Sequence, residues 1–127
     1  SIDFLDIVFK LEKAFDIKID REAFTHALQR ASILSNEKYR GVRLEASNGA
    51  VKIIAHNPQH EEAVEELEAD LNFDQIAIGF NVTYLLDALL AIEAERVQLE
   101  LKDANSSCLI TSENGGADRH VVMPLKL

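Results

Sequence analysis

The period of the apolar residues changes along the chain, and this change most constrains the fold. Residues 1–15 and 20–34 carry apolar side chains at helical spacing, and Asp20 is a suitable N-cap for the second segment. A third helical run, 82–90, follows Asn81, a second candidate cap. Alternation typical of strands occupies seven other segments: 16–20, 42–46, 51–55, 76–80, 96–102, 107–112 and 120–125. Three helical segments and about seven strands predict an α+β domain.

One acidic segment fits both periods. Residues 61–71 (EEAVEELEADL) have high helical propensity, and Val64, Leu67 and Leu71 form a helical stripe. Ala63, Leu67, Ala69 and Leu71 also lie on one side at period two. The local pattern favours a helix. In contrast, Asn48-Gly49 is a clear hairpin signal, since both turn positions require positive φ.

Length and charge limit the class of protein. The 127 residues suffice for one domain with a core, and no run approaches the roughly 20 apolar residues that a membrane span needs. With 22 acidic against 13 basic residues, the formal charge is −9. DNA and anionic membranes are bound through Lys and Arg, so we expect neither to be bound unaided. We find no signal-peptide pattern and expect a cytoplasmic protein.

No set of residues has the spacing of a catalytic or metal site. His56 and His60 are separated by Pro58, and the glutamates of 61–68 lack the pattern of an EF-hand loop. Cys108 has no local base and reads as a small buried hydrophobe. We therefore expect a binding or scaffold module, with no enzymatic activity, no metal and no cofactor.

The C-terminal segment VVMPLKL is apolar up to Leu127. Such a tail occupies a groove or forms one side of a groove for a partner, and Met suits adaptable binding surfaces. For Val121 and Val122 alone, a last core strand is an equal alternative.

Four ordered segments resemble a known family: SILSNEKYRGVRLEASNG, AHNPQHEEAVEE, IGFNVTYLLDAL and VVMPLKL. They are similar to the third domain of the bacterial DNA polymerase III beta subunit, the sliding clamp, from about Asp20 to Leu127. The resemblance implies two helices packed on curved antiparallel sheets and a non-enzymatic processivity factor. It also implies that residues 61–71 form a strand whose acidic edge faces the next protomer. The matching interface positions are Ile33, Leu34, Glu61, Val64 and Glu65.

The resemblance further implies a pocket for linear motifs of DNA polymerases and the clamp loader. Its third-domain wall corresponds to Tyr39, Asn81, Tyr84, Asn105, Ser107, Val121, Val122, Met123, Pro124, Leu125 and Lys126. Leu125 and Lys126 stand where Met and Arg are common. The other wall belongs to a second domain outside the match, so we expect weakened peptide affinity. DNA would be encircled only by a full ring.

Residues 1–19 resemble instead an acyl carrier protein, from its phosphopantetheine serine (here Ser1) through its second helix. We interpret the chain as a chimera of a carrier segment, 1–19, and a clamp domain, 20–127. A carrier function is not expected, because the rest of the carrier bundle is missing. The predicted helix would pack on the sheet or form a homodimer. An open sheet edge would likewise favour a homodimer. A recombined or engineered domain with no native activity is the alternative.

Overall fold

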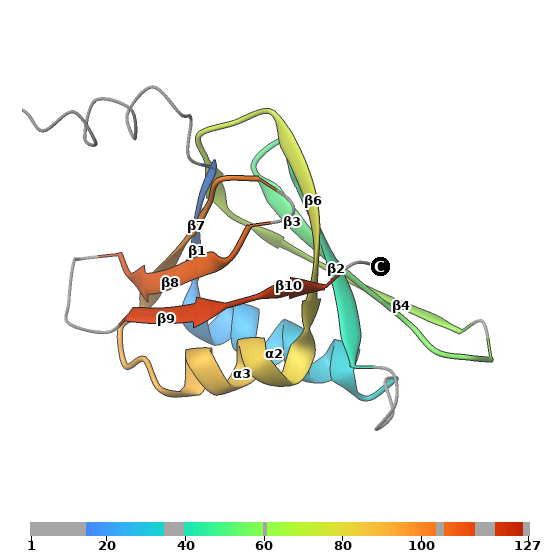
Figure 1. The fold of residues 1–127 in the computed structure, drawn as a ribbon. Helices are drawn as coiled ribbons and strands as arrows, with labels where there is room; N and C mark the ends of the chain where they lie inside the picture. The colour runs from blue at the N-terminus through green and yellow to red at the C-terminus, as the bar shows by residue number, and fades with distance from the viewer. Residues whose placement is uncertain (1–14, 35–39, 60, 104–105, 114–118, 126–127) are drawn as a thin grey trace, which may run out of the picture.

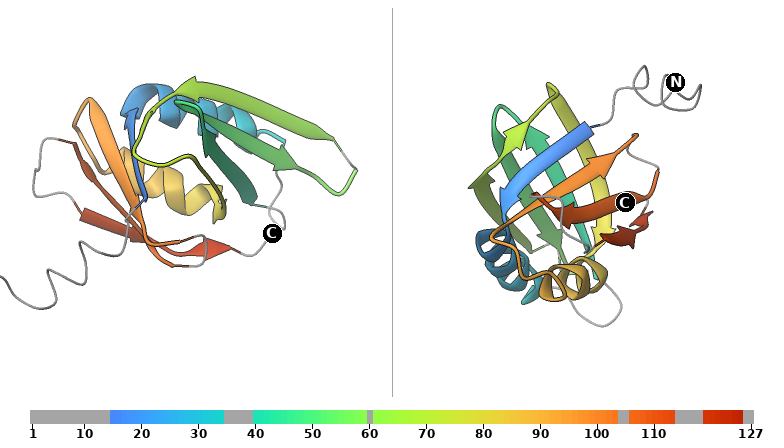
Figure 2. Two further views of the ribbon diagram at one scale, coloured as in Figure 1. Left: turned by 90° about the horizontal axis from the view of Figure 1, so that it is seen from above. Right: turned by 90° about the vertical axis from the view of Figure 1, so that its left-hand side faces the viewer.

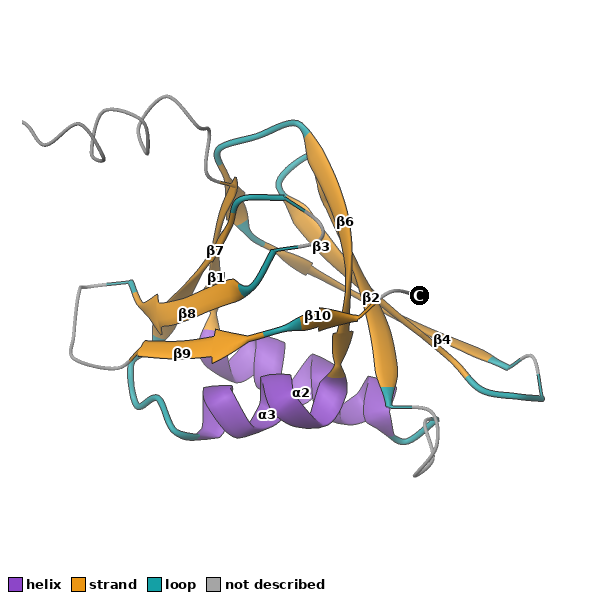
Figure 3. Ribbon diagram, in the orientation of Figure 1, coloured by secondary structure: helices purple, strands orange, loops and turns teal. Residues whose placement is uncertain are grey.

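The computed structural model describes residues 15–34, 40–59, 61–103, 106–113 and 119–125 (Figure 1). The predicted N-terminal helix lies outside these residues except for Phe15. The described part contains two helices and two antiparallel five-stranded sheets (Figure 3). This arrangement confirms the predicted α+β class, with two helices on antiparallel sheets.

The chain passes twice through the same series of elements. The first half consists of β1 (Phe15–Asp20), α2 (Arg21–Ser32), β2 (Gly41–Ser47), β3 (Ala50–His56), β4 (Glu62–Glu68) and β5 (Asp70–Leu71). The second half consists of β6 (Gln75–Asn81), α3 (Val82–Leu90), β7 (Arg96–Leu101), β8 (Cys108–Ser112), β9 (Arg119–Val122) and β10 (Pro124–Leu125). Each half therefore reads strand, helix and four strands.

The two halves exchange strands. One sheet has the order β5-β1-β7-β8-β9 and the other β10-β6-β2-β3-β4; we call them the β7 sheet and the β2 sheet. The first strand of each half, β1 or β6, joins the sheet of the other half. The last short strand, β5 or β10, crosses over and pairs beside it. The halves are thus related by an approximate internal twofold axis.

Both helices begin where their caps are predicted. The Asp20 carboxylate accepts a hydrogen bond from the Ala23 amide at 2.8 Å. The Asn81 side-chain oxygen accepts one from the Thr83 amide at 2.9 Å and one from the Tyr84 amide at 3.4 Å. These bonds satisfy amides that the helix itself leaves without acceptors. The helices then lie side by side along one side of the molecule (Figures 1 and 2).

The core lies between the two sheets and the helices. Alternate residues of the central strands point inward, as the period-two pattern predicts; Val42, Leu44 and Ala46 of β2 are examples. Apolar residues of α2 and α3 fill the remaining side: Phe24, Ala27, Leu28, Ala31, Leu85 and Leu89. The predicted hairpin is also confirmed, since Asn48 and Gly49 have φ of 52° and 74°.

The acidic segment 61–71 is extended, so the helix favoured by its local pattern is wrong; the single strand implied by the resemblance is divided at Ala69 into β4 and β5, which belong to different sheets. β4 pairs with β3 along its length, from His56 opposite Glu62 to Ala50 opposite Glu68. Ala63 and Leu67 are partly buried against the core on the helix side of the sheet. Pairing and burial, which depend on distant residues, here override helical propensity.

Two other expectations need correction. Phe15 belongs to β1 and not to a helix: it pairs with Leu101, and its ring contacts that of Phe73 edge-on, with centroids 5.1 Å apart. The single strand expected over 120–125 is divided at Met123, because β9 pairs with β8 whereas β10 pairs with β6.

Candidate functional site

The C-terminal segment crosses from one sheet to the other and exposes apolar side chains on the way (Figure 1). Val122 is 4% exposed and anchors the segment in the core, whereas Val121 and Met123 on either side are 66% and 63% exposed. The core-strand alternative therefore holds for Val122 and not for Val121, and the groove stays a prediction. Val122 is a core residue, and its neighbours form surface.

The segment passes the start of α3. Pro124 and Leu125 of β10 pair with Phe80 and Gly79, just before the Asn81 cap. Tyr84, in the first turn of α3, is 58% exposed. Large exposed apolar side chains thus stand on two segments far apart in sequence, α3 and the C-terminal segment, and α3 contacts β9. We call this region the C-terminal corner: Tyr84, Val121, Met123 and Leu125.

Other predicted residues of this site are placed only in part. Ser107 is exposed and stands one step beyond the Cys108–Val122 pair, toward Met123. Asn81 acts through its cap, which orients the turn that carries Tyr84. Tyr39, Asn105 and Lys126 lie outside the described residues. The exposed apolar corner suits the apolar end of a partner chain, since monomeric surfaces seldom gather such side chains without a partner.

The second candidate surface is the free edge of β4, the last strand of the β2 sheet. One edge of β4 pairs with β3, and no described strand pairs with its other edge. Glu62, Val64, Glu66 and Glu68 are exposed and point to the outer face of the sheet. Ile33, which follows α2, is 83% exposed. Charged side chains on a free edge discourage indiscriminate pairing, which is consistent with an edge kept for a selected partner.

The predicted protomer-interface residues gather around this edge but differ in what they do. Ile33 and Val64 are exposed, whereas Leu34 is partly buried. Glu61 accepts a hydrogen bond from the Asn57 side chain at 2.9 Å, within the β3–β4 connection. Glu65 points to the helix side, where it binds Arg30. The contact between Arg30 and Glu65 has no signal in the local sequence beyond a cation in the last turn of a helix.

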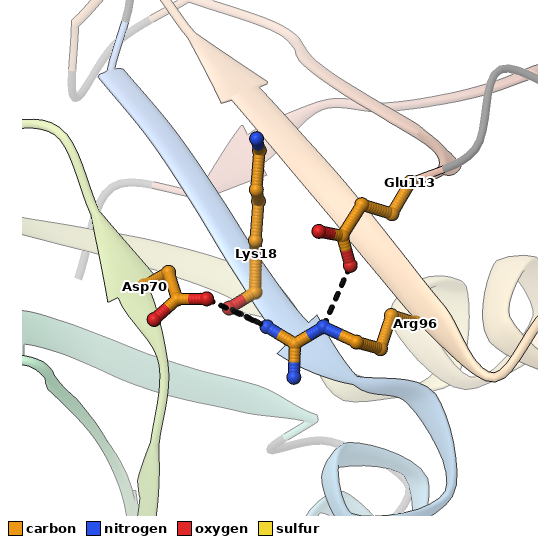
Figure 4. Close-up of polar contacts among 4 residues, drawn as sticks. All are labelled: Lys18, Asp70, Arg96 and Glu113. Carbon is orange, nitrogen blue, oxygen red and sulfur yellow. Dashed lines mark hydrogen bonds and ion pairs between the residues drawn. The ribbon is translucent and has the colours of Figure 1, made fainter.

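The internal twofold relates the C-terminal corner to a site of opposite character. The counterpart of the β9-to-β10 crossover is the β4-to-β5 crossover. Here the Arg96 side chain bonds to Asp70 of β5 and to two neighbouring segments (Figure 4). Arg96 Nη2 donates to Asp70 Oδ2 at 3.0 Å and to the Lys18 carbonyl at 3.3 Å, and its Nε donates to Glu113 Oε2 at 2.6 Å. The β4-to-β5 crossover is thus held by ion pairs, whereas the β9-to-β10 crossover exposes apolar side chains.

The described residues carry no metal cluster. No three of their His, Cys, Asp and Glu side chains are placed to hold an ion, and His60 lies outside them. Cys108 is fully buried, and burial together with the nearby Glu100 charge raises the pKa of its thiol to about 12. The thiol is therefore protonated at neutral pH and is not an activated nucleophile. None of the described helices has the length and apolar content to cross a membrane.

Comparisons with known proteins point to one family. The family described as "DNA polymerase III beta subunit, C-terminal domain" matches residues 8–126, so the match includes part of the segment 1–19. The beta sliding clamp of Pseudomonas aeruginosa is 49% identical over 108 residues, which are 85% of this chain and 29% of that protein. The Escherichia coli K12 clamp is 46% identical over 101 residues, 80% of this chain and 28% of that protein.

The fold agrees with this similarity. The crystal structure of the Pseudomonas aeruginosa DNA polymerase III subunit beta superposes with a TM-score of 0.85 and 47% identity, covering 89% of this chain and 31% of that one. The chain thus spans somewhat under a third of the length of the curated relatives it matches.

Proposed function

Since the chain belongs to the DNA polymerase III beta subunit family and corresponds to its C-terminal domain, we propose that it is the partner-binding domain of a sliding clamp, a non-enzymatic processivity factor. Its C-terminal corner would receive linear motifs of DNA polymerases and the clamp loader. The observation that carries the proposal is the exposure of Val121, Met123 and Tyr84 around the buried anchor Val122. Covering these side chains with the apolar end of a motif would favour binding, because it removes apolar surface from water.

Peptide titration tests this proposal. A fluorescein-labelled clamp-binding peptide is titrated with the chain, and its anisotropy is followed. We expect binding that Met123→Ala weakens about tenfold, because anchor contacts typically contribute 1–2 kcal/mol. Leu90→Ala is the matched control, since Leu90 is also an exposed apolar residue but lies at the far end of α3. Equal binding by the two variants, or no binding at all, would count against the C-terminal corner as the peptide site.

The peptide affinity should be lower than that of a full clamp protomer. The resemblance assigns the other wall of the pocket to a second domain, and a half-formed groove buries less of its ligand. Affinity equal to that of the full-length Pseudomonas aeruginosa clamp, measured with the same peptide, would contradict this expectation.

The free edge of β4 is the proposed protomer interface. Its exposed glutamates fit a basic surface on the first domain of a neighbouring protomer, and Ile33 and Val64 add apolar contact. DNA would be held only by the closed ring built from such contacts, in the cytoplasm. Association through this edge should weaken with added salt, since exposed charges are screened beyond about 8 Å at physiological ionic strength.

Residues 1–19 carry a separate proposal, namely that an acyl-carrier-like segment precedes the clamp domain. The family match from residue 8 and the pairing of β1 within the β7 sheet favour a boundary before Phe15. Incubation with a phosphopantetheinyl transferase and coenzyme A should leave Ser1 unmodified by mass spectrometry. Homodimerisation through this segment or an open edge is tested by light scattering, where a monomer at all concentrations would exclude it.

A further inference from the structure

Glu65 differs from the other glutamates of β4 in the direction of its side chain. It pairs across the sheet with the buried Ile53, and so lies on the helix side together with Ala63 and Leu67. Glu62, Glu66 and Glu68 alternate with it and point to the outer face. A partner that met the outer acidic face would therefore meet those three glutamates and not Glu65.

Glu65 already has a cationic partner within the domain. Its Oε1 accepts a hydrogen bond from Arg30 Nε at 2.7 Å, with the two side chains 27% and 57% exposed. Arg30 stands in the last turn of α2, where its charge also interacts favourably with the helix dipole. The bond joins residues 35 positions apart and connects a helix end to the edge strand.

Each partner of this bond has an exposed apolar residue close to it in sequence. Val64 directly precedes Glu65, and Ile33 follows Arg30 by three positions. By strand alternation the Val64 side chain points to the outer face of the sheet. Ile33 follows α2, which packs against the opposite face. An exposed apolar side chain thus stands on each of the two segments that Arg30–Glu65 joins.

We infer that Arg30 and Glu65 are a positioning pair that fastens the free edge strand to the end of α2. The pair holds β4 in place for strand-to-strand pairing and holds together the two segments that carry Ile33 and Val64, while the outer glutamates supply the charge that a basic partner meets. This inference refines the proposed protomer interface and rests on it for the identity of the partner. The fastening itself is a property of the single chain.

Hydrogen exchange of the chain alone tests the fastening. Glu65→Gln and Arg30→Gln should each speed exchange of the β4 amides bonded to β3 by about two- to fivefold, the range for a partly exposed ion pair. The double variant should exchange no faster than either single variant, because both remove the same bond. Glu68→Gln is the matched control: it removes an outer glutamate of the same strand, opposite Ala50, and should leave exchange unchanged.

Two further readouts separate a charged bond from general packing. The Arg30 Nε–H resonance should shift in Glu65→Gln and not in Glu68→Gln. Sodium chloride at about 1 M should remove the difference between Glu65→Gln and the parent chain, because it screens exposed pairs. Unchanged exchange in Glu65→Gln, or additive effects in the double variant, would overturn the inference. Since no partner is present, that result would leave the proposed interface standing, and failure of partner binding would leave the fastening standing.

Discussion

At the scale of single residues, Arg96 shows how one side chain stabilises several strands. It bonds to the Lys18 carbonyl of β1, Asp70 of β5 and Glu113 after β8. Lys18 and Asp70 belong to the other half of the chain, so these two bonds form only in the exchanged arrangement, whereas Glu113 belongs to the same half as Arg96. We therefore expect Arg96 to contribute more to stability than an isolated surface cation does.

Arg96→Gln should lower the free energy of unfolding by about 1–2 kcal/mol, because three acceptors lose a charged donor together. Urea denaturation measures this change. Arg43→Gln serves as the comparison, since Arg43 forms an exposed pair with Glu45 and should change stability by less than about 0.5 kcal/mol. Equal losses in both variants would show that the Arg96 bonds do not act as a network.

Cys108 predicts an alkaline loss of stability. Its pKa is raised from 9.0 to about 12 in the folded chain, first by burial and then by Glu100. A group with a raised folded pKa stabilises the fold below its unfolded pKa, and that stability is lost as the pH rises through the folded pKa.

Between pH 9 and 12 the parent chain should therefore lose more stability than Cys108→Val, in which no thiol can ionise in the unfolded state. Urea midpoints of both proteins across this range give the difference. Parallel pH profiles for the two would contradict the assigned pKa. At neutral pH the native thiol should also resist alkylation until urea unfolds the chain.

At the scale of elements, sequence pattern predicted best where local chemistry decides the structure. Asp20 and Asn81 were recognisable as caps, and Asn48-Gly49 as a hairpin, because each acts on amides or dihedral angles within three residues. β4 was not predictable locally, since its extended form depends on pairing with β3. The break at Met123 depends likewise on two different partner strands.

The site followed the same division. Alternation could suggest that Val121 and Met123 share one side of a strand, but not that α3 brings Tyr84 to the same corner. The resemblance supplied that grouping. The role of Arg30 escaped both approaches, because a cation near a helix end is ordinary and its contact with Glu65 spans 35 positions.

Asn81→Ala should destabilise the domain by about 1 kcal/mol, since the Thr83 and Tyr84 amides lose their capping acceptor. It should also weaken peptide binding, because Tyr84 stands in the uncapped turn. Asn81→Asp retains an acceptor and should restore stability in urea denaturation. A stable Asn81→Ala variant would mean that the β6–β10 pairing, and not the cap, holds the start of α3.

At the scale of the whole molecule, the charge of −9 outweighs any basic patch. We expect the chain to show no retention of a labelled DNA duplex in an electrophoretic assay at 0.15 M salt, because phosphate binding requires cations that release counterions. At low salt, any binding should disappear steeply as salt is added. Salt-resistant binding to a linear duplex would overturn this expectation, together with the view that DNA is held only by a ring.

The described part of the domain has four edge strands, and the two longer ones, β4 and β9, belong to different sheets and lie on different sides (Figure 1). The edges are alike in origin and unlike in chemistry: β4 has seven residues and is rich in glutamate, whereas β9 has four and includes Arg119. The domain therefore has two chemically different edges, and a line from one to the other has a direction. Units joined through such edges follow one another head to tail, and the angle between the edges decides whether their line bends back on itself.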